Sequence, residues 1–320
     1  MLRDAMRDTL RSALEPAESL LLGLGKPVRS PPVFIVSLPR SGSTLLYLLL
    51  IQRFRFSYFS NFAMSCPASP GTLTVLGAPF GVCMGGIRME NNFGETRGWN
   101  GPNQGYRTWN RWLAAQSDYI DPVDIPVASC RRLRQTIGLI ESAVNAPFIN
   151  KWQKNATRIR ALHAVFPEAV FIHLRRDRLL TAQSILLARR KLKLSQDQWF
   201  SAKPRHYSAD PGKSDLRQAA EQVALLELEL EQDKALIGAE RFFELNYEHL
   251  CKDLGATLTA FANWYEVVAH RALRKRPEVV VQLNESNSIR ISDQEVAEIN
   301  GIFREVADQF GRARAGPPGE

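Results

Sequence analysis

The sequence predicts an α/β fold of three layers, in which helices flank a central, mostly parallel sheet. Two segments, 33–46 and 170–191, each combine a short apolar run, a polar turn and a helical pattern. Further strand and helix patterns alternate along the chain, as is typical of parallel sheets, because a crossover helix returns the chain between parallel strands. This interleaving favours a single domain within the 320 residues.

Composition and charge narrow the classes of function. No apolar run approaches the ~18–20 residues that cross a bilayer, and the charged start, 1–8, lacks the apolar core of a secretory signal. A net charge of +8 favours anionic ligands. The basic clusters at 189–191 and 271–276 are more typical of solvated helix ends than of nucleic-acid sites, so we expect no nucleic-acid partner.

The four cysteines, Cys66, Cys83, Cys130 and Cys251, are scattered and form no C-x-x-C pair. We therefore expect reduced thiols, a cytoplasmic location and no zinc site.

We expect three regions along the chain. Residues 1–28 form an N-terminal amphipathic helical segment, with Leu2, Met6, Leu10 and Leu14 near one side. We expect this helix to pack on the domain; the alternative is peripheral contact with a membrane, where it would reach lipid-linked acceptors. A single domain over 29–312 and a disordered Gly/Pro tail over 313–320 complete the chain.

The first strand, turn and helix have the pattern of a phosphate-binding loop. Backbone N–H groups from about Ser41 to Thr44 converge at the positive end of a helix, Gly42 permits a close approach, and the Ser43 hydroxyl adds a donor. Compared with G-x-x-x-x-G-K-[ST], only Gly42 and Thr44 are in register, and the cation is Arg40 instead of the lysine. This difference disfavours ATP hydrolysis.

The following elements can be placed in order from their periodicity. We expect helices at 44–52, 107–115, 128–144 and 157–166, strands at 58–60 and 148–150, and a long loop at 66–107 whose many glycines and prolines show no sustained period. A loop of that length in a compact domain is usually functional.

The second half of the chain repeats the alternation. We expect strands at 170–174 and 242–245, helices at 178–191, 215–237, 254–268 and 292–310, and a polar loop at 195–215. Ser292 and Glu295 fit a capping box at the start of the last helix.

A second candidate phosphate site follows the strand at 170–174. Arg176 offers a guanidinium fork at the turn, Asp177 is a good N-cap, and Ser184, eight residues after Arg176, lies in the second turn of the helix.

These two sites resemble those of sulfotransferases that use 3′-phosphoadenosine 5′-phosphosulfate (PAPS). Residues 39–46 match the 5′-phosphosulfate loop P-[RK]-[ST]-G-[ST]-[ST], and 176–184 match the 3′-phosphate motif R-[DN]-P-x5-S, with Arg178 in place of proline. Weaker similarity to the bacterial and tyrosylprotein branch covers 94–97 and 150–151, and residues 243–250 resemble a late strand and turn seen across the superfamily. The resemblance extends with gaps from about 31 to 265 and implies a P-loop NTPase-like sulfotransferase fold.

The resemblance also implies a function and a set of residues. We expect an O-sulfotransferase that moves a sulfuryl group from PAPS to a hydroxyl acceptor by in-line transfer, without a metal. The implied cofactor-binding residues are Arg40, Ser41, Gly42, Ser43, Thr44, Leu45, Arg176 and Ser184. Arg290 is a candidate for the late basic residue that covers the 3′-phosphate in many relatives.

For catalysis we expect Arg40 to stabilise the leaving side, Lys151 to assist, and Glu95 to act as the base. An ion pair between Glu95 and Arg97 is the structural alternative. His206 is the second candidate base, whereas His163 and His173 have the pattern of structural residues.

The sequence indicates less about the acceptor than about the cofactor. Arg97, Trp99 and Asn103 mix charge, aromatic and amide groups that suit a carbohydrate or glycolipid. Two other functions stay open: a small-molecule P-loop kinase, disfavoured by Ser43 at the lysine position, and a non-catalytic nucleotide or polyanion binder.

Overall fold

The fold is taken from a computed structural model. It describes residues 2–83, 85, 87, 91–92, 95–113, 117–207, 212–277, 283 and 287–315; the side chains of 2–12, 91–92, 95 and 311–315 lie outside this description. The helices are α1 (Leu2–Gly23), α2 (Ser43–Arg53), α3 (Pro70–Gly77), α4 (Tyr106–Leu113), α5 (Val127–Val144), α6 (Ile159–Val165), α7 (Arg178–Leu192), α8 (Asp215–Ile237), α9 (Tyr247–Lys252), α10 (Leu254–Ala269) and α11 (Asp293–Ala315). The strands are β1 (Val33–Ser37), β2 (Asn91–Asn92), β3 (Glu95–Thr96), β4 (Ile149–Lys151), β5 (Val170–Arg175) and β6 (Phe242–Asn246).

The central sheet has the strand order β4-β1-β5-β6, and all its pairs are parallel. Ser37 pairs with Leu174, so β1 and β5 end side by side. Ile35 pairs with Lys151, which ends β4 on the other side of β1. The carboxyl ends of these three strands therefore bring their loops to one edge of the sheet, where ligands of open α/β folds bind.

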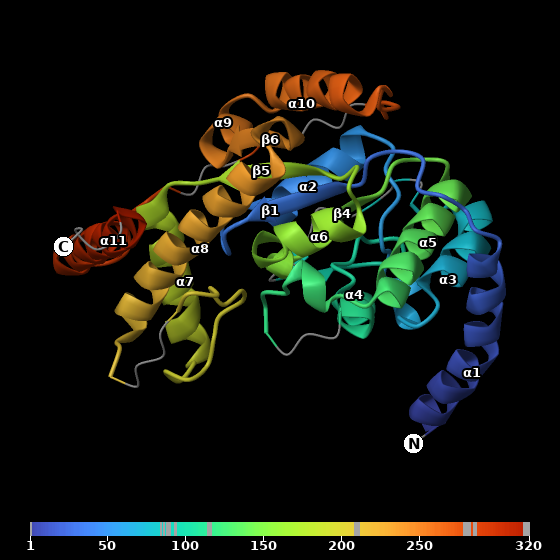
Figure 1. Cartoon of the computed structure of the whole chain (residues 1–320), viewed down its shortest axis with the longest axis horizontal. Helices are drawn as coiled ribbons and strands as arrows, with labels where there is room; N and C mark the ends of the chain where they lie inside the picture. Colours follow the sequence, from blue (N-terminus) through green and yellow to red (C-terminus); the bar gives the residue numbers. More distant parts are fainter. Residues whose placement is uncertain are drawn as a thin grey trace.

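Both faces of the sheet are covered, which makes three layers. Val33 and Ile35 pack into a core with α2 and α10, whereas Phe34 and Val36 pack into a second core with α4, α5 and α6 (Figure 1). Burial on both faces explains why β1 is a continuous apolar run instead of an alternating pattern.

A third apolar cluster joins α7, α8 and α11 beside the sheet (Figure 1). Ile185 of α7, Val223 of α8 and Ile302 of α11 are almost completely buried in it. The last helix begins as expected: Ser292 N donates to Glu295 Oε2 (2.9 Å), and Glu295 N donates to Ser292 Oγ (3.3 Å).

The elements expected from periodicity are mostly confirmed, with three differences. The strand expected at 58–60 is wrong: Ser57 and Ser60 form only isolated bridges, to Phe148 and Pro102, and Pro102 has no N–H to continue a ladder. The expected loop at 66–107 contains the short strands β2 and β3 and the helix α3, in which six of the eight residues are buried, so no amphipathic period marks it. The separate short helix α9 was not expected.

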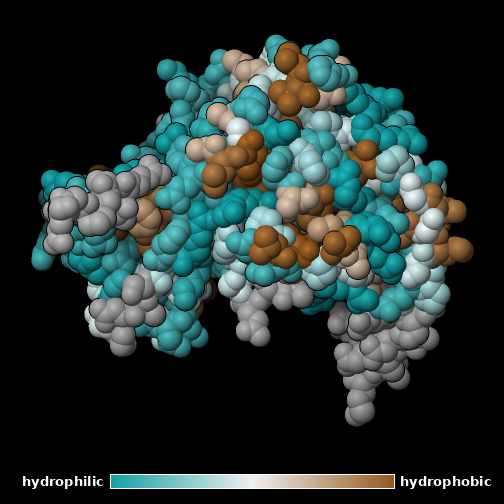
Figure 2. All heavy atoms as spheres, in the orientation of Figure 1, coloured by the Kyte–Doolittle hydropathy of each residue, from teal (hydrophilic) through white to brown (hydrophobic). Residues whose placement is uncertain are grey.

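The N-terminal helix is attached to the domain through its second half. Glu18 is buried and accepts hydrogen bonds from Gly71 N (3.1 Å) and Thr72 N (2.6 Å), which caps the first turn of α3. Within the described part of the chain, no helix is both long and apolar enough to cross a membrane. The coloured surface in Figure 2 is mainly hydrophilic, and its hydrophobic residues form small, separate patches.

Candidate active site

The turn between β1 and α2 has the geometry of an anion cradle. Arg40 (φ 66°) and Gly42 (φ 91°) are both left-handed, and Ser41 Oγ donates to Leu38 O (2.8 Å), which closes the turn. Gly42 is the N-cap of α2 and provides no side-chain cap. The first N–H groups of α2 are thus left for a ligand at the positive end of the helix.

Tyr247, at the start of α9, leaves no room for a side chain at position 42. A Cβ built on Gly42 would lie 2.5 Å from Tyr247 Cδ2, inside van der Waals contact. The same ring carries the guanidinium of Arg176, whose Cζ lies 4.7 Å from the ring centroid. Tyr247 therefore packs against both the phosphate loop and Arg176 in the turn after β5.

The two phosphate motifs contact each other directly. Arg176 Nη1 donates to Arg40 O (2.8 Å), and Arg40 Nε donates to Ser184 Oγ (3.1 Å). Asp177 caps α7 by accepting from Leu180 N (2.8 Å). The expected N-cap is confirmed, and residues far apart in the sequence form one cluster.

These residues line a cleft of about 880 Å³. The expected cofactor-binding residues on its wall are Arg40, Gly42, Ser43, Thr44, Leu45, Arg176 and Ser184. Ser41 is 1% exposed and is not among the lining residues, so its role is to hold the turn.

Arg290 reaches the same cleft from the segment before α11. Its N–H donates to Gln183 Oε1 (2.6 Å), and Gln183 Nε2 donates to Ser288 O (3.0 Å). Gln183 of α7 thus holds residues 288–290 against the helix that carries Ser184. Arg290 was a candidate for the 3′-phosphate site, but the sequence did not predict where it lies. No local pattern around Gln183 predicts its contacts with residues 288–290.

Lys151 is fully buried at the end of β4, and its Nζ has no hydrogen-bond partner among the described residues. Burial, and then the nearby charge of Arg40, lower the pKa of Lys151 to about 7. The pKa of Arg40 is also lowered, first by burial and then by the charge of Arg176. The charges of Arg40, Arg176 and Lys151 together favour an anionic ligand at this site.

Arg178, which stands in place of the motif's proline at the start of α7, is not among the residues that line the cleft. Its Nε lies 2.6 Å from Glu227 Oε2 of α8, and its Cζ lies 4.4 Å from the ring centroid of Phe303. This contact compensates for a cation at the positive end of α7.

The loop residues that were expected to bind the acceptor do not line the cleft that the cofactor-binding residues line. Arg97, Trp99 and Asn103, all of them described, are not among the residues that line the cleft. The Asn103 amide is engaged within the loop, because Nδ2 donates to Asn61 Oδ1 (2.8 Å) and Oδ1 accepts from Gly105 N (2.9 Å). Glu95 lies in β3, opposite Asn92, and its side chain falls outside the described residues.

His206, the second candidate base, lies away from the phosphate residues. It lines a separate cavity of about 610 Å³, together with Arg160 and Arg205. Its Nδ1 is 3.0 Å from Glu229 Oε1, which is buried. We therefore correct this alternative: His206 does not reach the cleft that holds Arg40.

His163 and His173 have the structural positions expected for them. His173 is buried in β5 with Nδ1 3.0 Å from Glu244 Oε1, and His163 lies in α6. In the described ranges, no three His, Cys, Asp or Glu side chains are grouped as metal ligands would be.

We predict that Gly42→Ala lowers the free energy of unfolding by about 1–3 kcal/mol, because the new methyl group meets Tyr247 and the φ of 91° disfavours a side chain. Urea denaturation measures the change. The control is Gly301→Ala in α11, where no atom lies within 4 Å and a gain of up to about 1 kcal/mol is expected. Equal midpoints for Gly42→Ala and wild type would show that Tyr247 does not constrain this position.

Comparison with known proteins agrees with this geometry. The model of the sulfotransferase family matches residues 31–269. Similar folds occur in crystal structures of sulfotransferase STF9 from Mycobacterium avium (TM-score 0.56, 17% identity, 89% of this chain and 78% of that chain) and sulfotransferase STF1 from Mycobacterium tuberculosis H37Rv (TM-score 0.51, 14% identity, 94% and 81%). A search of curated proteins finds no significant match. The family match covers most of the chain, and the chain therefore belongs to the sulfotransferase family.

Proposed function

We propose that this sulfotransferase uses PAPS and transfers the sulfuryl group to a hydroxyl acceptor. One observation carries the proposal: Arg40 and Arg176, from two separate phosphate motifs, are hydrogen-bonded to each other in a single cleft. A nucleotide with phosphates at both its 5′ and 3′ positions would engage both motifs at once. A nucleotide with a 5′ chain alone would leave the Arg176 side without a ligand.

The residues present fit such a nucleotide. The first turn of α2, with the hydroxyls of Ser43 and Thr44, would hold the 5′-phosphosulfate, because N–H groups at a helix N-terminus bind anions. Arg176 and Ser184 would hold the 3′-phosphate, and Arg290 lies on the same cleft to complete the cationic set. PAPS, when bound, supplies the sulfuryl group and a phosphate leaving group.

The protein's part in the chemistry is positioning and charge. Arg40 would stabilise charge that develops on the leaving side, and buried Lys151 would add a second cation from the end of β4. Glu95 would take the proton of the acceptor hydroxyl. Asn61 supports this part of the chain, since its Nδ2 donates to Thr96 O (2.9 Å), beside Glu95.

For the acceptor we propose a carbohydrate or glycolipid. Trp99 supports a sugar-binding rim, because it is 52% exposed and its ring is held edge-on by Phe62 with centroids 6.2 Å apart. A cytoplasmic location and peripheral membrane contact through α1 stay predictions from the sequence.

We predict micromolar binding of 3′-phosphoadenosine 5′-phosphate (PAP), the desulfated product, and much weaker binding of AMP, measured by calorimetry without metal. Arg176→Ala should weaken PAP binding by about 10- to 100-fold, because a phosphate loses its charged hydrogen bonds. Arg175→Ala is the control, since Arg175 is half-exposed and lies 3.5 Å from Glu231 instead of on the cleft. Equal PAP affinity in Arg176→Ala would reject the 3′-phosphate site. Binding of Mg-ATP but not PAP would favour a kinase.

Glu95→Gln should keep PAP affinity within about twofold and lower turnover by about 10²- to 10⁴-fold, because the amide cannot accept the acceptor proton. The measurement is the initial rate of PAP formation from PAPS, with the best acceptor in a panel of simple alcohols and glycosides. His206→Gln, in the separate cavity, should keep the rate. Near-normal turnover in Glu95→Gln would exclude Glu95 as the base.

PAP binding should take up about one proton at pH 8 and fewer at pH 6. The pKa of Lys151, about 7 in the free protein, leaves it mostly neutral at pH 8, and a bound anion favours the charged form. At pH 6 Lys151 is already charged. The nucleotide's phosphates, with a pKa of about 6, release few protons at pH 8.

Calorimetry in buffers of different ionisation enthalpy measures this uptake. Lys151→Met should abolish it, and Lys26→Met, at an exposed position, should not. Uptake that persists in Lys151→Met would assign the proton to another group.

A further inference from the structure

Ser201 combines two unfavourable features on the wall of the cleft. Its backbone is left-handed (φ 70°), which few residues other than glycine adopt readily. Its Oγ is buried and has no hydrogen-bond partner within the described ranges, although Ser201 and Phe200 both line the cleft. Strained residues with unmet polar groups cluster at ligand-binding sites.

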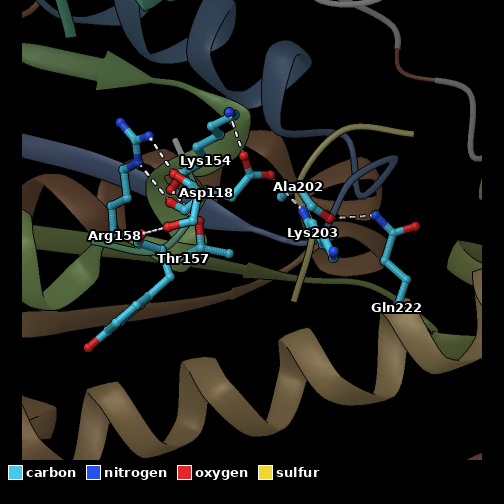
Figure 3. A network of polar contacts seen from close by, with 9 residues as sticks. Asp118, Lys154, Thr157, Arg158, Ala202, Lys203 and Gln222 are labelled. Carbon is cyan, nitrogen blue, oxygen red and sulfur yellow. Dashed lines mark hydrogen bonds and ion pairs between the residues drawn. The ribbon is translucent and has the colours of Figure 1, made fainter. Parts of the chain in front are cut away.

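Hydrogen bonds fix the backbone on both sides of Ser201. Gln222 of α8 donates through Nε2 to Phe200 O (2.8 Å) and to Ala202 O (2.6 Å). Lys203 N donates to Asp118 Oδ2 (2.7 Å). Figure 3 shows Gln222 and Asp118 reaching this segment from opposite sides. The surrounding structure therefore maintains the strained conformation.

Asp118 also brings a second segment beside Ser201. Its other carboxylate oxygen pairs with Lys154 Nζ, and its backbone oxygen accepts from Arg158 Nε (2.8 Å) and Thr157 Oγ1 (3.1 Å) (Figure 3). These three residues surround or belong to the 3-10 helix Gln153–Thr157. Asp118 thus joins the two walls of the cleft that follow β4 and α7.

Gln153 repeats the pattern of Ser201 on that second wall. It lines the cleft, and its Oε1 is buried without a hydrogen-bond partner in the part of the chain that is described. Its N–H donates to Gln104 Oε1 (3.3 Å), from the loop that also carries Glu95. Gln153 lies two residues after Lys151 and therefore close to the end of β4.

The cleft continues along α7 beyond the 3′-phosphate residues. Along α7, Leu192 is eight residues after Ser184, which corresponds to about 12 Å of helix. Leu187, Leu192 and Phe200 give this part of the cleft an apolar wall, and Leu192 is 47% exposed. The cleft as a whole has a volume typical of sites that bury a small molecule.

We propose that Ser201 and Gln153 bind non-reacting hydroxyl groups of an amphipathic polyol acceptor, such as a sugar headgroup that bears an alkyl chain. A hydroxyl group can donate to the amide oxygen of Gln153 and can both donate to and accept from the hydroxyl of Ser201, and a polyol offers several such groups. The neighbouring leucines and Phe200 suit the alkyl chain. This inference rests on the proposed function, which places the nucleotide at the phosphate motifs.

The test uses n-octyl β-D-glucopyranoside below its micelle concentration and n-octanol, which has the same chain and a single hydroxyl. Ligand-observed NMR titrations measure both against PAP-loaded enzyme. We expect Ser201→Ala and Gln153→Ala each to weaken glucoside binding by about tenfold, with octanol and PAP affinity unchanged. Ser201→Gly should lose the same glucoside affinity and unfold at a higher urea concentration, because glycine relieves the left-handed φ.

The control is His270→Gly at the end of α10, which is also left-handed (φ 48°) and exposed but is not on the cleft. It should gain stability and keep glucoside affinity. Glucoside affinity unchanged in both alanine variants, no glucoside binding to PAP-loaded wild type, or a loss of PAP affinity in Ser201→Ala would each overturn the inference. If wild type binds no PAP, the proposed function fails instead, and the same titrations on the free enzyme still decide the roles of Ser201 and Gln153.

Discussion

The contact between Arg176 and the phosphate loop is the interaction on which the rest of the site depends. Arg176 donates to the carbonyl of Arg40 and stacks on Tyr247, so one guanidinium joins the turns after β1, β5 and β6. This is possible because β5 lies between β1 and β6 in a parallel sheet, with all three carboxyl ends at one edge. The strand order therefore brings together the turns that line the cleft.

A concentration of positive charge distinguishes this edge of the sheet. Burial, and then the charge of Arg176, lower the pKa of Arg40, and burial, followed by the charge of Arg40, lowers the pKa of Lys151. Other buried charges stabilise the fold through their partners: Arg189 pairs with Asp215, Arg205 pairs with Asp233, and Glu18 caps the start of α3. The gathering of three cations at this edge of the sheet therefore favours an anionic ligand there.

The cleft combines two kinds of lining. Arginines, hydroxyl groups and the start of α2 come from the two phosphate motifs, whereas Ser201, Gln153 and apolar side chains come from other segments. Asp118 and Gln222 hold the segment of Ser201 in place without lining the cleft (Figure 3). Rigid support of this kind limits the conformational entropy that is lost when a ligand binds.

The local sequence determined most of the elements and both phosphate motifs. Apolar runs, glycines and caps act within a few residues, so β1, β5, α8 and the Ser292 cap could be predicted. Local patterns could not reveal α3, in which packing buries six of the eight residues, or the separation of His206 from the cleft. They also could not show that Tyr247 limits position 42, or that Asp118 joins residues 154 and 203. Those features depend on side chains from distant segments that only the tertiary structure brings into contact, and no local periodicity records such contacts.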